Sequence, residues 1–275
     1  MPRLIRAALE RAGVEEQEKV SSGVDVVGDI AIVRLDGFSA GEKKRIAGAL
    51  LEEMSTVRVV MEQEGGIGGE YRLRKLRHLA GARRTLTVHR ENGCAFRVDV
   101  ARCYFSPRLS TERLRVARSV KPKERVLNMF AGVGPFSIAI AKLAGAKVTS
   151  CEVNAYAAKL HEENDALNRV EDRVTVVRGD AADLPKSTKA RYDRVLMPHP
   201  SEADRFLPTA LSLAKKGGTV HYYRHLLGED ESEAAEALKD ELSILLPRGS
   251  KYTVRRVRDV GPRWIEMAAE IRVSA

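Results

Sequence analysis

The sequence has few cysteines and no long apolar run. Its three cysteines, Cys94, Cys103 and Cys151, lack metal-type spacing, and their odd number argues against a disulfide framework. We expect them to be buried core residues, and we expect no bound metal. No segment approaches the roughly 18 uninterrupted apolar residues of a membrane span, and the basic N-terminal segment has no apolar signal core. These absences exclude a membrane anchor and a disulfide-stabilised secreted domain, and they predict a cytoplasmic protein.

Positive charge is in excess. The 275 residues include 47 Lys and Arg against 38 Asp and Glu, a formal net charge of +9, which favours a polyanionic partner. The segment 71–90 contains no acidic residue, and we interpret it as a phosphate-binding surface that includes Arg83 and Arg84. A solvated loop and strand edge is the alternative. The basic residues of this segment are Arg72, Arg74, Lys75, Arg77, Arg83, Arg84 and Arg90.

A small mixed domain between two helices is expected in the first 119 residues. Residues 1–23 have the amphipathic spacing of a helix, and residues 107–119 form a linker helix that starts at a proline. Between them, residues 24–106 predict a small α+β domain. Its strands are expected at 24–35, 57–61, 86–89, 95–100 and 100–105, its helix at 39–53, a flexible glycine-rich loop at 64–70 and a hairpin turn at 91–93.

Residues 120–275 show strands alternating with helices. This alternation implies right-handed crossovers and a mostly parallel sheet covered on both faces, so we assign an α/β, Rossmann-like domain. An antiparallel pair of strands is expected to close the sheet at 252–260 and 266–273. The other strands are expected at 125–130, 147–153, 174–180, 193–197 and 217–223, and the helices at 137–143, 155–168 and 203–214.

A glycine-containing turn follows the first strand of this second domain. It reads Phe130-Ala131-Gly132-Val133-Gly134-Pro135. In open parallel sheets, ligands bind beyond the carboxyl ends of the strands, and glycines let the backbone approach them closely. Glu152 ends the second strand, where a carboxylate accepts both hydroxyls of a ribose, and Asp180 closes the third strand, within reach of an adenine amino group. The sequence therefore predicts a nucleotide-like cofactor.

Two cofactors, NAD and S-adenosylmethionine, fit these features. The third glycine of a dinucleotide-binding turn is replaced by Ser137, and the fourth strand ends in Pro198-His199-Pro200. Methyltransferases that act on nucleobases often carry a short polar, proline-containing motif there to hold the target base. This combination favours S-adenosylmethionine and makes Pro198, His199 and Pro200 candidate substrate contacts, with NAD as the alternative.

Several motifs, in order along the chain, resemble one family of RNA-modifying enzymes. They occupy residues 27–33, 69–72, 89–93, 105–113, 128–138 and 218–223. These segments resemble the archaeal and eukaryotic tRNA (guanine-37-N1)-methyltransferases. The resemblance implies a class I S-adenosylmethionine-dependent methyltransferase domain preceded by an RNA-binding α+β domain. It also implies methylation of N1 of guanine 37, beside the anticodon, with the anticodon arm of tRNA as the partner. Separately, we expect a monomer.

The resemblance further implies residue roles. N1 of guanine carries a proton and is a poor nucleophile while neutral, so the enzyme must remove that proton and stabilise charge developing toward O6. Analogy with the family makes Glu112 the general base and Arg72 the cationic stabiliser, and it makes Arg108 a substrate contact. From the sequence alone, an ordinary helix ion pair of Glu112 with Arg115 or Arg108 is the alternative.

The chain departs from the family pattern after the fourth strand. Pro198-His199-Pro200 stands where the family usually has Asn-Leu-Pro, so we expect His199 or a backbone group to replace the missing amide. Asn128 replaces a common Asp in the first strand. The extra N-terminal domain of larger relatives is expected to be absent or reduced to one helix.

Three other functions stay open. An aminocarboxypropyltransferase of wybutosine synthesis would share the two-domain plan, but this chain keeps Arg108-Leu109 and the turn 133–136 of the methyltransferases. A dual-specificity enzyme would also methylate a tricyclic guanine derivative. A non-catalytic RNA-binding protein on a degenerate methyltransferase fold is the third, and the intact Glu152 and Asp180 argue against it.

Overall fold

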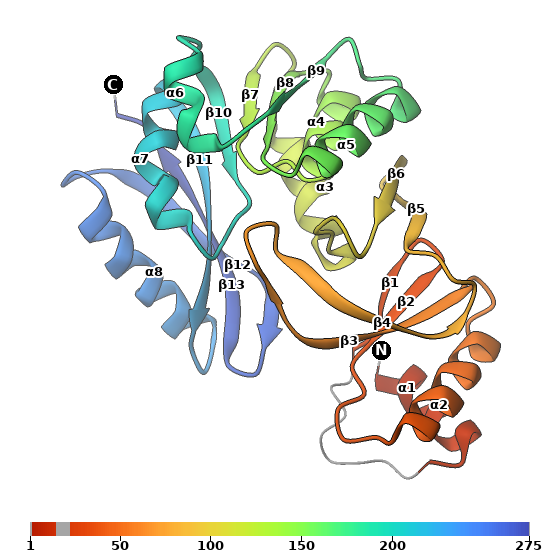
Figure 1. Ribbon diagram of the computed structural model, residues 1–275. Helices are drawn as coiled ribbons and strands as arrows, with labels where there is room; N and C mark the ends of the chain where they lie inside the picture. The colour runs from red at the N-terminus through yellow and green to blue at the C-terminus, as the bar shows by residue number, and fades with distance from the viewer. Residues whose placement is uncertain (1, 15–22, 275) are drawn as a thin grey trace. The chain divides into compact units, whose positions relative to one another are not determined.

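The computed structural model describes residues 2–14 and 23–274 (Figure 1). The chain divides into two compact units, Met1–Thr111 and Glu112–Ala275. The division falls inside helix α3 (Ser110–Ser119), which follows a short 3-10 helix at Pro107–Leu109. Among the described residues, no helix is both long and apolar enough to cross a membrane.

The first unit is built on a four-stranded sheet of order β1-β2-β3-β4. A capping box between Ser39 and Glu42 starts its second helix, as the sequence indicates. Leu9 of the first helix and Leu50 of the second are buried in one core with Val60. The N-terminal helix therefore belongs to the core of this unit. The elements are α1 (Pro2–Ala12), α2 (Ala40–Glu53), β1 (Asp25–Val27), β2 (Ile30–Val33), β3 (Val59–Gly68) and β4 (Leu73–Gly81).

The prediction of a flexible loop at 64–70 is wrong for most of that segment. Strand β3 continues to Gly68 because β4, which was not expected as a strand, pairs with it antiparallel at Ile67↔Arg74 and Gly68↔Leu73. Ladder hydrogen bonds use only the backbone, so glycines do not prevent pairing. Along β4, basic side chains hid the alternation that usually marks a strand.

The hairpin expected around residues 91–93 is confirmed, but the strand expected at 100–105 is wrong. Strands β5 (Leu86–Glu91) and β6 (Cys94–Asp99) pair antiparallel across Asn92 and Gly93, which have φ values of 47° and 74°. Beyond β6, the carbonyl of Asp99 accepts the N–H groups of the third and fourth residues after it. These local bonds bend the chain into turns.

The second unit is the expected Rossmann-like domain. Its seven-stranded sheet has the order β12-β13-β11-β10-β7-β8-β9, with β13 antiparallel to both of its neighbours. Figure 1 shows α4 and α5 over the β7–β9 half of the sheet, and α7 and α8 over the β10–β13 half. The strands are β7 (Arg125–Asn128), β8 (Lys147–Glu152), β9 (Val174–Arg178), β10 (Tyr192–Met197), β11 (Ala214–Leu227), β12 (Lys251–Gly261) and β13 (Trp264–Arg272). The helices after α3 are α4 (Pro135–Ala144), α5 (Ala155–Asn168), α6 (Leu184–Ser187), α7 (Ala203–Leu213) and α8 (Glu231–Leu245).

Helix α8 was not among the expected elements. Its buried residues Ala234, Leu238 and Leu242 repeat every four residues and form one apolar stripe against the sheet. The strand order reverses between β7 and β10, because the chain leaves β7 toward β8 and β9 and then returns. In such a sheet, this switch point is where a ligand binds.

Candidate active site

The turn between β7 and α4 lies at the switch point. Gly132 and Gly134 have φ values of 55° and 92°, which L-amino acids with side chains rarely adopt. The N–H of Ala131 donates to the carbonyl of Cys151 at 2.9 Å, so the turn is attached to the end of β8. Pro135 opens α4 at a position where its missing N–H costs nothing.

Glu152 lies beside this turn. Its Oε2 accepts the N–H of Gly132 at 2.6 Å, and its Oε1 accepts the N–H of Asn154 at 2.8 Å. Burial raises the pKa of Glu152, while these backbone bonds act in the opposite direction. Each oxygen keeps lone-pair capacity for one more donor. The carboxylate is therefore held in place by two backbone N–H groups, and the ribose contact expected for it stays a prediction.

Asp180 caps a short 3-10 helix. It is exposed, and its Oδ1 accepts the N–H of Ala182 at 2.8 Å at the start of a short helix. The strand expected at 174–180 ends at Arg178, so Asp180 lies two residues beyond β9, and its contact with an adenine amino group stays a prediction. An adenine amino group would have to bond the second oxygen of this carboxylate.

The structure brings Phe130 of the turn against the segment that follows β10. The rings of Phe130 and His199 have their centroids 4.9 Å apart, and Phe206 meets Phe130 edge-on at the same distance. The N–H of His199 donates to the carbonyl of Met197 at 2.7 Å. Since β7 and β10 are neighbours, the predicted cofactor turn and the predicted substrate segment form one site.

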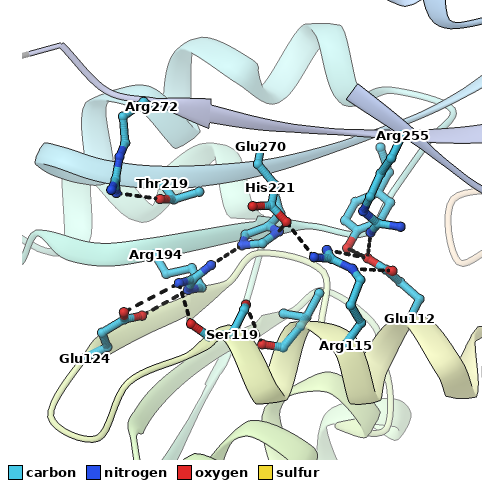
Figure 2. A network of polar contacts seen from close by, with 12 residues as sticks. Glu112, Arg115, Ser119, Glu124, Arg194, Thr219, His221, Arg255, Glu270 and Arg272 are labelled. Carbon is cyan, nitrogen blue, oxygen red and sulfur yellow. Dashed lines mark hydrogen bonds and ion pairs between the residues drawn. The ribbon is translucent and has the colours of Figure 1, made fainter. Parts of the chain in front are cut away.

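Glu112 is 4% exposed and accepts hydrogen bonds from three side chains. Arg115 donates to both of its oxygens, at 3.0 Å and 3.1 Å. Tyr223 donates its hydroxyl to Oε1 at 2.6 Å, and Arg255 bonds the same oxygen. Figure 2 shows this cluster between α3 and the sheet. Burial and the adjacent charge of Glu112 raise the pKa of Tyr223, so the phenol stays protonated and acts as a donor.

Tyr223 connects this cluster to the cofactor turn. Its ring centroid lies 6.4 Å from that of Phe136, the second residue of α4. Of the three partners of Glu112, only Arg115 was expected, from its helical spacing. Arg255 lies 143 residues along the chain from Glu112, and no local pattern indicates such a partner.

The polar contacts continue along α3, away from Glu112. Arg115 also donates to Glu270 at 2.7 Å, and the Nδ1 of His221 lies 3.7 Å from the same carboxylate. His221 is fully buried, and burial together with Arg194 lowers its pKa far below the ordinary value. It is therefore neutral and accepts from the Nη1 of Arg194 at 2.6 Å. Arg194 also bonds Glu124 at 3.0 Å (Figure 2).

Arg72 and Arg108 make their contacts within the first unit, whereas Glu112 belongs to the second. The Arg72 guanidinium lies 4.9 Å from the ring centroid of Tyr104. Arg108 donates to Asp25 at 2.6 Å, and Asp25 also accepts from Arg74 at 2.9 Å. Burial acts to raise the pKa of Asp25, but the two guanidinium groups outweigh it, and the pKa is lowered. The helix ion pair of Arg108 with Glu112, one alternative from the sequence, is not formed.

Several cations of the basic stretch 71–90 are already paired with acidic side chains. Acidic residues from elsewhere in the first unit pair with four of its cations, whereas Arg83 and Arg90 are exposed and have no acidic partner within the described residues. The pairs are Arg74 with Asp25, Lys75 with Glu64, Arg77 with Glu62 and Glu64, and Arg84 with Asp29. The candidate phosphate contacts are thus reduced to a few side chains.

A buried His–Asp pair lies beneath the glycine turn. The Nε2 of His161 is 3.4 Å from Oδ1 of Asp165, and a Cβ added to Gly134 would lie 2.3 Å from the His161 ring. Burial lowers the pKa of His161 to about 3. Burial, helped by Glu162 and Glu171, raises the pKa of Asp165 to about 8. At neutral pH the imidazole of His161 is therefore neutral and the carboxyl group of Asp165 is protonated.

This pair predicts that the protein loses stability above pH 6.5. From pH 4 to 8 the folded protein keeps a proton on Asp165 that the unfolded chain has lost, so rising pH favours unfolding. The depressed pKa of His161 has the opposite effect below pH 6.5. Above that pH only Asp165 acts, and about 2 kcal/mol at most should be lost by pH 8. Urea unfolding at several pH values measures this, and Asp165→Asn should remove the decline. An unchanged decline in that variant would assign it to another group.

Known families and known proteins match both units of the chain. The family described as the TRM5/TYW2 methyltransferase domain matches residues 87–242, and the TYW2 N-terminal domain matches residues 5–85. Among similar proteins, the tRNA (guanine(37)-N(1))-methyltransferase Trm5b of Pyrococcus abyssi is 39% identical over 91% of this chain and 74% of its own. The tRNA 4-demethylwyosine(37)-methyltransferase Taw21 of Saccharolobus solfataricus is 34% identical over 95% and 97%. A tRNA(Phe) (4-demethylwyosine(37)-C(7)) aminocarboxypropyltransferase of Pyrococcus horikoshii is 39% identical over 72% and 69%.

Among solved structures, similar chains again include both Trm5 and TYW2 proteins. The complex of aTrm5 with tRNALeu has a TM-score of 0.82 and 33% identity, covering 93% of this chain and 73% of that one. TYW2 of Pyrococcus horikoshii in complex with MeSAdo has a TM-score of 0.74 and 30% identity, covering 100% and 99%.

Proposed function

The chain belongs to the TRM5/TYW2 methyltransferase family, and we propose that it methylates N1 of guanine 37 in tRNA, using S-adenosylmethionine. One structural observation carries the proposal. The cofactor turn, the segment after β10 and the buried carboxylate of Glu112 are joined by direct contacts, through Phe130 with His199 and through Phe136 with Tyr223.

The residues at the switch point fit this cofactor. Glu152 presents a carboxylate for the ribose hydroxyls that is fixed by the backbone N–H groups of Gly132 and Asn154. Bound S-adenosylmethionine supplies a methyl group already activated on a sulfonium. The task of the protein is then to orient guanine N1 in line with that methyl group and to take up the N1 proton.

We assign the proton to Oε2 of Glu112. Arg115, Tyr223 and Arg255 all donate to Oε1, whereas Oε2 accepts only one bond, from Arg115. Oε2 retains a lone pair for the N1–H of guanine.

The remaining substrate roles are proposed from the resemblance to the family. His199 and the backbone of the Pro198-His199-Pro200 segment hold the target base next to Phe130. Arg72 is the cation that stabilises charge at O6. Arg108 acts indirectly, because its guanidinium holds Asp25 at the start of β1. We further propose that the protein acts on tRNA as a monomer in the cytoplasm.

A second candidate is methylation of 4-demethylwyosine at position 37. The similarity to Taw21 covers 97% of that enzyme, and the chain lacks the amide expected at Pro198 for the guanine substrate. Aminocarboxypropyl transfer is a third possibility, supported by the similarity to the Pyrococcus horikoshii aminocarboxypropyltransferase.

A labelling experiment separates these reactions. The protein is incubated with tRNA carrying G37, A37 or 4-demethylwyosine at position 37, and with cofactor labelled in either the methyl or the aminocarboxypropyl group. We expect methyl label on the G37 transcript and none on A37. Methyl label on the 4-demethylwyosine tRNA alone would favour the second candidate. Aminocarboxypropyl label without methyl label would place the chain with the aminocarboxypropyltransferases, and no label on any tRNA would favour a binding role.

Arg83 and Arg84 should respond differently to replacement. Arg83 is exposed, so Arg83→Ala should weaken tRNA binding and lower the salt slope of log K by about 1 while leaving the melting temperature unchanged. Arg84 bonds Asp29 and the carbonyl of Leu86, so Arg84→Ala should lower the melting temperature. Equal salt slopes in Arg83→Ala and the wild type would remove Arg83 from the tRNA interface.

A further inference from the structure

A depression of 520 Å³ opens on the second unit. It lies at the end of the sheet where the parallel strands begin, and the cofactor turn lies at the other end. Strands β10 and β11 run from this end of the sheet toward the cofactor turn. Arg194 of β10 and Thr219 of β11 are register partners close to the depression. Figure 2 shows Glu124, Arg194, Thr219 and Arg272 at the end of the polar network away from Glu112. The lining residues are Ser119, Lys121, Glu124, Arg194, Thr219, Lys251, Tyr252, Thr253, Glu270 and Arg272.

The two acidic residues of the depression are already neutralised. Glu124 is paired with the buried Arg194 at 3.0 Å. Glu270 is paired with Arg115, which lies outside the lining, at 2.7 Å. Neither carboxylate is therefore available to balance further positive charge.

Three cations of the lining are left uncompensated. Lys121, Lys251 and Arg272 are exposed, and none has an acidic partner among residues 2–14 and 23–274. Arg272 is nevertheless held in place, because its Nη1 donates to the carbonyl of Gly217 at 2.9 Å and to Oγ1 of Thr219 at 3.0 Å. One side of its guanidinium is thus anchored to the wall, and its remaining N–H groups are left for a ligand.

This chemistry selects phosphate groups. Two ammonium groups and a fixed guanidinium around one depression match phosphate oxygens, for which arginine supplies paired donors and lysine supplies point charge. The aromatic residue of the lining, Tyr252, packs against the hydrophobic core, so recognition of a base by stacking has little support. We propose that this depression is a phosphate-binding site, separate from the cofactor site, that takes backbone phosphates of RNA or a free polyphosphate.

A charge-matched pair of variants tests the site. Lys121→Ala/Lys251→Ala removes two cations from the depression. Lys159→Ala/Lys189→Ala removes two exposed cations from elsewhere on the same unit and is the control. For each protein, the tRNA dissociation constant is measured across a salt series, and pyrophosphate is titrated by calorimetry.

If RNA phosphates bind there, the salt slope for tRNA should fall by about 2 in the depression variant and should keep its wild-type value in the control. If a free polyphosphate binds, the tRNA slope should be unchanged, and the heat of pyrophosphate binding should be lost in the depression variant alone. Identical behaviour of both variants in both assays would overturn the proposal. Neither assay needs methyl transfer, so failure of the proposed function would be seen separately, in the labelling experiment.

Discussion

Replacing Glu112 with glutamine is expected to lower turnover by about 10²–10⁴-fold, the usual contribution of a general base, with little change in S-adenosylmethionine affinity. A glutamine cannot take the N1 proton, although it has nearly the shape of the carboxylate. Single-turnover methyl transfer and calorimetric titration of the cofactor measure the two quantities. Because the variant leaves Arg255 without its anion and Arg115 with Glu270 alone, its melting temperature must be recorded as well.

The chain offers a matched control for this variant. Glu241 of α8 accepts bonds from Tyr222 and, at 3.0 Å, from Arg224, so it too is a carboxylate held by a tyrosine and an arginine of β11. Glu241→Gln should lose stability without the loss of turnover. If Glu112→Gln keeps wild-type turnover, or if both variants lose it equally, Glu112 is not the base.

Gly134→Ala is expected to destabilise the second unit by roughly 2–5 kcal/mol and to abolish cofactor binding. The new Cβ would lie 2.3 Å from the His161 ring, and Gly134 has a φ of 92°. Overpacking a buried site costs about 1–3 kcal/mol, and a left-handed conformation costs another 1–2 kcal/mol. Chemical unfolding and cofactor titration would record both effects.

Gly145→Ala separates the two causes. Gly145 ends the same helix with a φ of 68°, but nothing lies within 4 Å of an added Cβ. It should show the conformational cost alone, with cofactor affinity preserved. Adding His161→Ala to Gly134→Ala removes the obstructing ring and should restore part of the lost stability. Equal losses in Gly134→Ala and Gly145→Ala would mean that the His161 contact is unimportant.

The succession of strands and helices along the second unit and the glycine turn after β7 could be predicted because their signals are local. Glycine spacing after β7 and a carboxylate at the end of β8 require only the alternation of strands and helices, and the contact between Gly132 and Glu152 follows from the neighbouring positions of these strands. The closing pair β12 and β13 was likewise visible as alternation. These features depend on periods of a few residues.

The rest depended on partners distant in the sequence. Strand β4 was missed because its basic side chains gain acidic partners only through folding, as with Arg77 and Glu62. The same pairing reduced the phosphate surface expected at 71–90. Arg108 could be expected to contact Glu112, four residues away, but Asp25 bonds it instead. Ion pairs between residues far apart in the sequence follow no regular spacing, so a single sequence does not reveal them.

Tyr222 and Tyr223 are consecutive on β11, so their side chains point to opposite faces of the sheet. Tyr223 bonds Glu112 of α3, and Tyr222 bonds Glu241 of α8. One dipeptide thus attaches a helix to each face of the central sheet. A slip of β11 by one residue would leave only one phenol facing a carboxylate, so that either Glu112 or Glu241 would lose its phenol donor. The alignment of this strand is therefore encoded in polar pairs as well as in its apolar residues.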